Sequence, residues 1–522
     1  MSAATKTRAS LAVRLAPLPA MRGHKDARVI HRGRRQRVLF RNAAGEFRTR
    51  RARTQEEEEA ASDFALLRAF IADPAFWALA ARLPGNRCRT GRHGRPTHNP
   101  SWAFLLLAGL TALTGSQRSA ITFLADPLMW DFLVLYTEKH RPAGFDSLGH
   151  KPPARHHLST FLRKWESDEW AAFRVTAHRQ FRADACQRAR EFGLFDPDQP
   201  LRYKTVDPGQ HIVFDGTVFS GPANKVVTRA DGEGKQIKGG REEVWGSKVV
   251  FASNRTDDYQ SRIVTDFEQV TGKTRSGVGD EAAATIESAK RLKEALPGLR
   301  GVIVDSILRG QHLTRLAADG IIVTNYPHAA ANPESRKGGR FADGRIDKSS
   351  GLRTITHQRA NGRTCTHTLV TVGGVLYQPV LNDEGDQVLE ECPVIGYDHR
   401  RNPSGDHRFY LSVRLPCRHG DITASIPLYH EDKAAGAVQG ISRGEHLRFY
   451  PPGTPQFHAL YSRRNDSESL HNQIKRRLTR LPAYRVKRQM LFILGMSLLH
   501  NAATRAFALQ RQGEPNPLDG TG

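Results

Sequence analysis

The chain has 522 residues, enough for roughly two to four domains that each bury a core. It carries 78 Lys and Arg against 53 Asp and Glu, which gives a formal net charge of +25 at pH 7. Such an excess of positive charge is typical of proteins that bind polyanions, and it disfavours an ordinary metabolic enzyme. Nucleic acid and an anionic membrane surface are therefore the two candidate partners.

A membrane partner is not supported by the sequence. The longest apolar run, Trp102 to Leu113, is too short to span a bilayer, and the N-terminus lacks the apolar segment of a signal peptide. No two of the five cysteines form a Cys-x-x-Cys pair, which fits a reducing intracellular compartment. We expect a cytoplasmic protein that associates with the nucleoid and not with a membrane.

Two short Cys-x-His pairs, Cys365 with His367 and Cys417 with His419, are candidate zinc ligands. Residues two apart lie on one face of a strand, so each pair can reach a single ion. Because the spacing matches no standard zinc motif, we favour the interpretation that these are scattered strand and turn residues.

Changes in composition and periodicity divide the chain into six segments. Residues 1–62 are basic and poor in large apolar residues, so we expect a disordered arm, either a phosphate-binding tail or a leader without a role. Residues 63–195 are predicted to be helical and to bind DNA. Residues 196–330 and 455–510 are predicted to form one α/β core, 331–454 a β-rich insertion between its two parts, and 511–522 a flexible tail.

One pair of helices in the N-terminal region resembles a helix-turn-helix. Asn99 and Pro100 are expected to start the first helix, Gly115 to end it, and a second helix over 117–125 follows after a short turn. The same spacing also occurs in helical domains that do not bind DNA.

Two buried-strand signals in the α/β segment end in carboxylates. HIVFDG ends at Asp215 and LRGVIVD at Asp305; VWGSKVVFAS and SRIVTDF are further predicted strands. A helix over 280–296, a helix over 308–318 and the strand GIIVTN complete an order of three strands, helix, strand, helix, strand. This order matches a ribonuclease-H-like fold, in which an antiparallel meander is extended by parallel strands with helices on both faces.

A third carboxylate lies on a predicted helix near the C-terminus. Tyr461, Arg464, Glu468 and Lys475 have offsets of 0, 3, 7 and 14, so on an α-helix they share one stripe. Asp466 lies within the same segment and is a possible helix N-cap. A single Asp after a strand is more often a turn residue, and Asp207, Asp266 and Asp319 are alternatives of that kind.

The Tyr-x2-Arg-x3-Glu-x6-Lys spacing resembles the signature of one group of DDE transposases of bacterial insertion sequences. The resemblance covers about residues 64–507 and implies that Asp215, Asp305 and Glu468 are catalytic and bind two Mg²⁺ or Mn²⁺ ions. It implies that Tyr461, Arg464 and Lys475 bind the phosphates of the transposon end. It further implies an endonuclease that transfers the cut ends to target DNA, and a homodimer on DNA.

The sequence departs from this group in one respect. In members that form DNA hairpins, a tryptophan of the β insertion stacks on a flipped base, whereas here all six tryptophans precede Asp305. Tyr377, Tyr397 and Tyr410 are the kind of aromatic residue that the insertion offers instead. Hydrolysis followed by strand transfer is therefore better supported than a hairpin route.

Other functions remain as alternatives. A metal-dependent nuclease without strand transfer and a non-catalytic DNA-binding protein derived from a transposase would share most of these features. A nucleotide cofactor is not expected, because the phosphate-loop-like segment at 270–274 and the dinucleotide-like segment at 277–282 lack the required glycine or strand.

Overall fold

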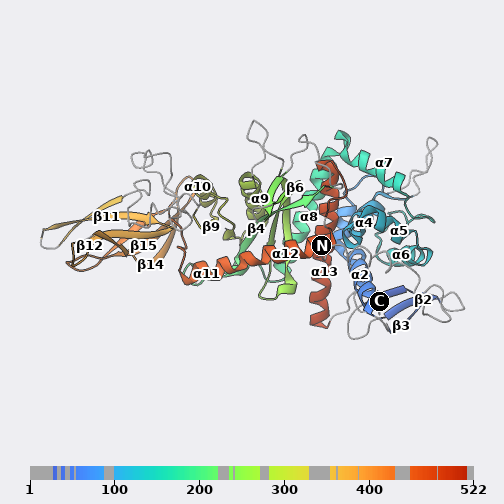
Figure 1. The fold of residues 1–522 in the computed structure, drawn as a ribbon, viewed down its shortest axis with the longest axis horizontal. Coiled ribbons are helices and arrows are strands. Elements are labelled where there is room, and N and C mark those ends of the chain that lie inside the picture. The colour runs from blue at the N-terminus through green and yellow to red at the C-terminus, as the bar shows by residue number, and fades with distance from the viewer. Residues whose placement is uncertain are drawn as a thin grey trace.

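The computed structural model describes most of the chain between residues 28 and 513 (Figure 1). The described ranges are 28–31, 37–41, 47–51, 55–86, 99–200, 202–221, 234–238, 242–270, 281–327, 353–359, 362–385, 387–428, 447–478 and 480–513. The two segments that resemble nucleotide-binding motifs, 270–274 and 277–282, lie mostly outside these described ranges. Figure 1 shows an elongated molecule with helices at one end, an α/β sheet in the middle and β-sheets at the other end.

The N-terminal segment contains regular structure that the sequence did not predict. Three strands, β1 (Arg28–His31), β2 (Arg37–Arg41) and β3 (Phe47–Arg51), form an antiparallel sheet in the order β1-β2-β3. β1 lies against helix α2 (Gln55–Ala72). The expectation of a disordered arm over 1–62 is therefore wrong for these strands and for the first turns of α2.

The helical end of the molecule is built around two long apolar helices that cross. Its helices are α2, α3 (Pro74–Ala80), α4 (Ser101–Thr114), α5 (Gln117–Leu124), α6 (Pro127–His140), α7 (Arg155–Glu166), α8 (Ala171–Glu191) and α13 (Val486–Gln512). At the crossing of α4 and α13, a Cβ added to Gly495 would lie 2.7 Å from the backbone nitrogen of Gly109. The two backbones approach this closely because Gly495 lacks a side chain, whereas a Cβ at Gly109 would instead collide with the ring of Phe70.

The helix pair α4 and α5 has the predicted boundary at Gly115, which adopts a left-handed conformation with φ 80°. The N-cap of α4 is Pro100 and not Asn99, and Asn86 Oδ1 accepts a hydrogen bond of 3.1 Å from Trp102 N in the first turn. Every residue of α4 is buried, whereas α5 exposes Arg118 and Thr122. Within this pair, α5 is the helix with a face available to DNA.

None of the described helices alone is both long and apolar enough to cross a bilayer. α5 and α6 meet that test only when taken together, and they are bent by 84° at the break between them.

The central sheet combines antiparallel and parallel strands. Its strands are β4 (His211–Ser220), β5 (Gly234–Lys238), β6 (Glu242–Asn254), β7 (Ile263–Val270), β8 (Gly301–Ile303) and β9 (Ile322–Thr324). The order is β5-β6-β4-β8-β9, and β7 also pairs with β6. β6 runs antiparallel to β4, whereas β8 and β9 extend the sheet in parallel from β4. The chain is therefore mixed α/β, as predicted, with β5 as an additional strand.

Both faces of this sheet are covered. Along β6, Val249 and Phe251 pack into one core with α12 and α13, whereas Val250 and Ala252 pack into a second core with α9 (Glu281–Ala295) and α10 (Gly310–Ala318). This alternation explains why the apolar run of β6 is continuous, because each successive residue is buried on the opposite face.

In the described part of residues 328–454, seven strands separate β9 from the last part of the core. β10 (Arg353–Gln358), β11 (Thr364–Val372), β12 (Val375–Leu381) and β13 (Gln387–Glu391) form one antiparallel sheet. β14 (Val394–Arg401), β15 (His407–Leu415) and β16 (Ile422–Pro427) form another. The chain then returns through α11 (Pro455–Tyr461), a 3₁₀ turn (Ser462–Arg464) and α12 (Asn465–Arg477) toward the central sheet (Figure 1).

Candidate active site

Asp215 lies on β4 where the parallel pairing of that strand ends. β8 pairs with residues 211–213 of β4, and Asp215 follows two positions later. The prediction that the strand ends at Asp215 is wrong, because β4 continues to Ser220 as an antiparallel partner of β6. β8 ends at Ile303, whereas β4 continues past Asp215. The side chain of Asp215 therefore lies at an open edge of the sheet.

Asp305 and Glu468 lie close to this position, although 163 residues of sequence separate them. Asp305 follows β8 by two residues, and Glu468 is in the first turn of α12. The guanidinium of Arg464 joins them, with Nη2 3.5 Å from Asp305 Oδ2 and Nη1 3.2 Å from Glu468 Oε1. The side chains of Asp305 and Glu468 are 56% and 60% exposed, so solvent reaches both carboxylates.

Asp215 is the most buried member of the group, with 17% of its side chain exposed. Burial raises the pKa of Asp215 above its ordinary value, and the negative charge of Asp305 acts in the same direction. Ser467, whose hydroxyl donates to Asp215 Oδ2 at 3.0 Å, and Arg464 oppose this rise. The influence of Asp305 and Arg464 on Asp215 shows that the three predicted carboxylates form one electrostatic group around Arg464.

The predicted stripe on the C-terminal helix is divided by the 3₁₀ turn. Tyr461 ends α11, Arg464 ends the turn, and Glu468 and Lys475 lie on α12. The prediction of one continuous α-helix from Tyr461 onward is therefore wrong. α11 and α12 nevertheless run in the same direction on either side of the turn (Figure 1). The ring of Tyr461 stacks on Phe457 at 5.0 Å between ring centroids, which fixes it at the start of the turn.

Burial alone would lower the pKa of Arg464, but the charges around it raise it above the ordinary value. The groups responsible are Tyr461, Asp305, Asp215 and Glu468. Arg464 therefore stays protonated and acts as the cation at the centre of the carboxylate group.

A buried ion cluster that the sequence did not reveal fixes the position of α12. Asp466 is not an N-cap but lies inside the helix, where Arg255 Nε contacts Asp466 Oδ2 at 2.7 Å and Arg262 Nη2 contacts Oδ1 at 3.4 Å. All three side chains are at most 8% exposed. Because Arg255 follows β6 and Arg262 precedes β7, the cluster ties the helix of Glu468 to the antiparallel half of the sheet.

His471, one turn after Glu468, is a further neighbour of Asp215. Its Nδ1 lies 3.5 Å from Asp215 Oδ2. Burial, followed by the charge of Lys475, lowers the pKa of His471 to about 3, so the ring is neutral at physiological pH. This effect places Lys475 near His471, on the side of α12 that faces the carboxylates.

Glu281 adds a fourth acidic group beside the site. It forms an ion pair with Lys248 of β6, and a side chain at Gly216, next to Asp215, would collide with both residues. Burial raises the pKa of Glu281, and Asp215 and Asp305 contribute to the rise. Its sequence signal is an acidic residue at the start of α9, which is indistinguishable from an ordinary helix-stabilising charge.

A different group of residues is the tightest cluster of metal-ligand type in the described ranges. Ligand atoms of His178, Asp266 and Glu268 all lie within 4.8 Å of one another. Asp266 is fully buried, and His178 Nε2 at 3.0 Å, Arg182 Nε at 3.1 Å and the Ser288 hydroxyl at 2.6 Å contact its oxygens.

Burial alone would raise the pKa of Asp266, but its partners lower it to about 2. Since His178 and Arg182 belong to α8, Asp266 to β7 and Ser288 to α9, the network joins three elements. Arg182 at 3.1 Å and Arg291 at 3.7 Å from Asp266 Oδ2 would compete with a metal ion for this carboxylate, which favours a structural role for the network.

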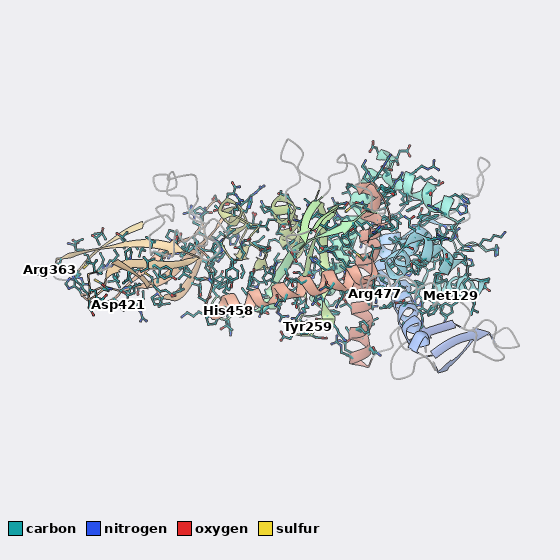
Figure 2. The ribbon with its side chains drawn as sticks, in the orientation of Figure 1. Met129, Tyr259, Arg363, Asp421, His458 and Arg477 are labelled. Atoms are coloured by element: carbon teal, nitrogen blue, oxygen red, sulfur yellow. The ribbon has the colours of Figure 1, made fainter. Side chains whose placement is uncertain are left out.

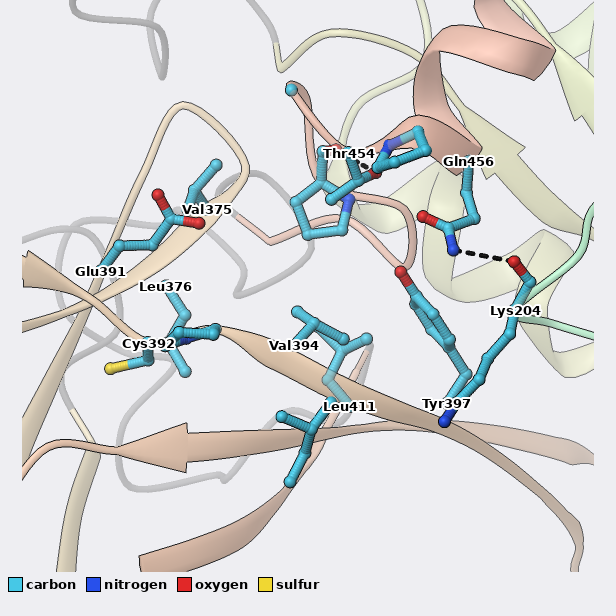
Figure 3. A pocket seen from close by; sticks show the side chains of 15 residues that line it. Lys204, Val375, Leu376, Glu391, Cys392, Val394, Tyr397, Leu411, Thr454 and Gln456 are labelled. Carbon is cyan, nitrogen blue, oxygen red and sulfur yellow. Dashed lines mark hydrogen bonds between the residues drawn. The ribbon is translucent and has the colours of Figure 1, made fainter. Parts of the chain in front are cut away.

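A cavity of about 480 Å³ lies away from the carboxylates, between strands of the insertion and residues 451–456 (Figure 3). Tyr397, one of the aromatic residues predicted to replace a tryptophan, lines it and packs against Phe449 at 5.1 Å between centroids. Tyr410 instead lies under Arg400, with the guanidinium 5.0 Å from the ring centroid. These two tyrosines are thus engaged within the insertion.

Comparisons with protein-family models, with curated proteins and with solved structures gave no match to this chain.

Proposed function

We propose that the chain is a DDE transposase, which binds the inverted-repeat ends of an insertion sequence, cleaves them and transfers the 3′ ends to target DNA. One observation carries the proposal: Arg464 contacts both Asp305 and Glu468, next to Asp215, although these residues come from three separate parts of the sequence. The three carboxylates and the arginine are the ones that the resemblance to transposases implies.

The topology supports the same proposal. β7, β6 and β4 form an antiparallel meander, and β8 and β9 continue it in parallel, with helices on both faces. This is the strand order expected of a ribonuclease-H-like core. In such a sheet, ligands bind beyond the carboxyl ends of the parallel strands, which is where Asp305 lies and where Asp215 meets the edge.

The donor set fits divalent metal ions of the Mg²⁺ type. Asp215, Asp305 and Glu468 offer only oxygen ligands, and two of the three are more than half exposed, so water can complete the coordination. The guanidinium of Arg464 shows that a cation is stabilised between Asp305 and Glu468. When bound, two such ions would activate the attacking oxygen and stabilise the leaving oxygen of the phosphodiester.

The chain's own side chains would position the DNA. Arg464 presents a planar set of donors that suits a phosphate, and Lys475 adds a point charge on α12, which follows Arg464 directly. Tyr461 places an apolar ring with a polar end beside them. Ser467 holds the carboxylate of Asp215 in place through its hydrogen bond, and the Asp466 cluster keeps α12 against the sheet.

Glu468→Gln tests the proposal on duplexes that carry the inverted repeats flanking the gene, with Mg²⁺ present. The wild type should nick the repeat ends and form joined products with a target plasmid, whereas Glu468→Gln should bind the ends equally well and lose cleavage by at least about 10³-fold. Glu287→Gln is a matched control, because Glu287 is an exposed helical carboxylate that pairs only with Arg315 among the described contacts.

The products separate the alternatives. Cleavage without joined products would establish a nuclease instead of a transposase. Undiminished cleavage by Glu468→Gln would refute the assignment of the catalytic group.

A further inference from the structure

The two Cys-x-His pairs of the insertion converge in the structure. Cys365 lies on β11, and Cys417 lies in the turn that follows β15, so the two cysteines belong to different sheets. Arg359 contacts both sulfurs, with Nε 3.0 Å from Cys365 Sγ and Nη2 3.0 Å from Cys417 Sγ. Two sulfurs that share one guanidinium lie close enough to share one cation.

The turn that holds Cys417 directs donors at its sulfur. The backbone N–H of His419 donates to Cys417 Sγ, and so does Arg359 Nη2 at 3.0 Å. The turn is closed by a hydrogen bond of 2.8 Å from Gly420 N to the Cys417 carbonyl, and Gly420 has φ +103°. A backbone donor two residues after a cysteine thus stabilises negative charge on the sulfur.

His367 supplies a buried imidazole nitrogen on the same strand face as Cys365. It is 4% exposed, and its Nδ1 lies 3.0 Å from Gln378 Oε1. Gln378 Nε2 donates to the carbonyl of Pro416 at 3.0 Å, so its Oε1 must accept from His367. Nδ1 therefore carries the proton, and Nε2 keeps its lone pair. Among the described residues, Nε2 has no hydrogen-bond partner.

These contacts also connect His367 through Gln378 to Pro416, which immediately precedes Cys417. A histidine whose Nδ1 is held by a neighbouring oxygen while Nε2 is free has the arrangement usual for a metal ligand. An unpaired polar nitrogen in a buried position is otherwise unfavourable.

We propose that Cys365, His367 and Cys417 bind a zinc ion that joins the two sheets of the insertion, with a water molecule as the fourth ligand. Two thiolates and an imidazole nitrogen are donors that Zn²⁺ prefers, in contrast to the all-oxygen group around Asp215. The zinc ion takes the place of the Arg359 guanidinium. Because the guanidinium contacts the carbonyls of His419 and Gly420 on the exposed side of the turn, it can withdraw into solvent.

Zinc binding requires the ligand atoms to move closer together. The sulfur and nitrogen atoms of this group do not all lie within 4.8 Å of one another, so they must move together as Arg359 leaves. Both sheets end at this point. Figure 2 shows Arg363 and Asp421, which flank the two cysteines in sequence, near the far end of the insertion. Zinc would therefore lock the end of the molecule that is most distant from the helices.

Cobalt binding to the reduced, full-length protein tests the proposal, because tetrahedral thiolate–Co²⁺ complexes absorb visibly. After treatment with a chelator, the wild type should bind about one Co²⁺ per chain with a thiolate charge-transfer band, and one equivalent of Zn²⁺ should abolish the band. Cys365→Ser and Cys417→Ser should each lose it. Gln378→Leu should weaken metal binding by about 10- to 100-fold, because it removes the oxygen that accepts a hydrogen bond from His367 Nδ1.

Two variants serve as controls. Cys392→Ala removes a buried cysteine of the same insertion and should leave the band unchanged. Arg359→Ala removes the competing cation and should keep or tighten binding. The proposal is overturned if the band is absent from the folded wild type, or if it persists in both Cys365→Ser and Cys417→Ser.

Discussion

At the scale of single residues, the site is organised by one positive group among several negative ones. Arg464 contacts Asp305 and Glu468, and its charge also stabilises the ionised form of Asp215. The pKa of Asp215 is nevertheless raised, so burial and the charge of Asp305 outweigh the contribution of Arg464 and Ser467. Concentrated negative charge of this kind costs folding stability and is typical of sites that bind cations.

Asp215→Asn should therefore stabilise the protein while abolishing DNA cleavage. A carboxyl whose folded pKa lies above its unfolded pKa lowers stability as the pH rises through that interval, because ionisation is harder in the folded state. The variant should unfold at a higher temperature than the wild type at pH 7. The difference should shrink as the pH falls toward the ordinary pKa of an aspartate and vanish below it, because the carboxyl is then protonated in both states.

Calorimetric melting from about pH 3 to about pH 8, a range that includes the ordinary pKa of an aspartate, measures this difference. Asp257→Asn is the control, since Asp257 is fully exposed and should show no such pH-dependent gain. If Asp215→Asn melted at a lower temperature than the wild type at pH 7, the inference that the ionised Asp215 carboxylate destabilises the fold would be contradicted.

At the scale of elements, the position of Glu468 depends on how α12 is attached to the sheet. Asp466 accepts from Arg255 and Arg262, and all three side chains are buried. Removing one partner from a buried ion cluster leaves uncompensated charge and is far more costly than losing an exposed pair.

Asp466→Asn should destabilise the protein by about 3–5 kcal/mol and reduce cleavage, because two arginines remain buried without their carboxylate. The free energy of unfolding from denaturant titration measures the first effect. Asp257→Asn, which breaks the ion pair of an exposed carboxylate with Arg463 on the preceding turn, should change this free energy far less. Equal costs for the two variants would argue against the Asp466 cluster as the anchor of α12.

The elements that the sequence predicted are those whose signals are local. The apolar runs of β4, β6, β7, β8 and β9 and the Gly115 helix end were visible because burial pattern and backbone conformation depend on neighbouring residues. The proximity of Asp215, Asp305 and Glu468 was predicted only through the resemblance to a family.

Features that depend on distant partners were not predicted. Asp466 looked like an N-cap because its partners Arg255 and Arg262 lie more than 200 residues away. Cys365 and Cys417 looked unrelated until the two sheets brought them to Arg359. Asp266, set aside as a turn residue, proved to be the centre of a buried network because α8 and α9 supply its cations. Side-chain partners across elements leave no periodic signal in the sequence.

At the scale of the whole molecule, the net charge of +25 and the elongated shape suit a protein that follows DNA (Figure 1). Transposition requires two ends to be held together, so we predict that two chains assemble on a pair of ends. Mass measurement of the complex with repeat-containing duplexes should give two chains per two duplexes, and the complex should dissociate steeply with added salt. One chain per pair of ends would contradict this assembly.

The central claim is that Asp215, Asp305 and Glu468 form one metal-binding catalytic centre. Asp305→Cys tests it most directly, because a thiolate is a poor ligand for Mg²⁺ and a better one for Mn²⁺. End cleavage by Asp305→Cys should be lost with Mg²⁺ and regained in part with Mn²⁺, while the control Asp257→Cys cleaves with both ions. Cleavage by Asp305→Cys at the wild-type rate with Mg²⁺ would contradict the account.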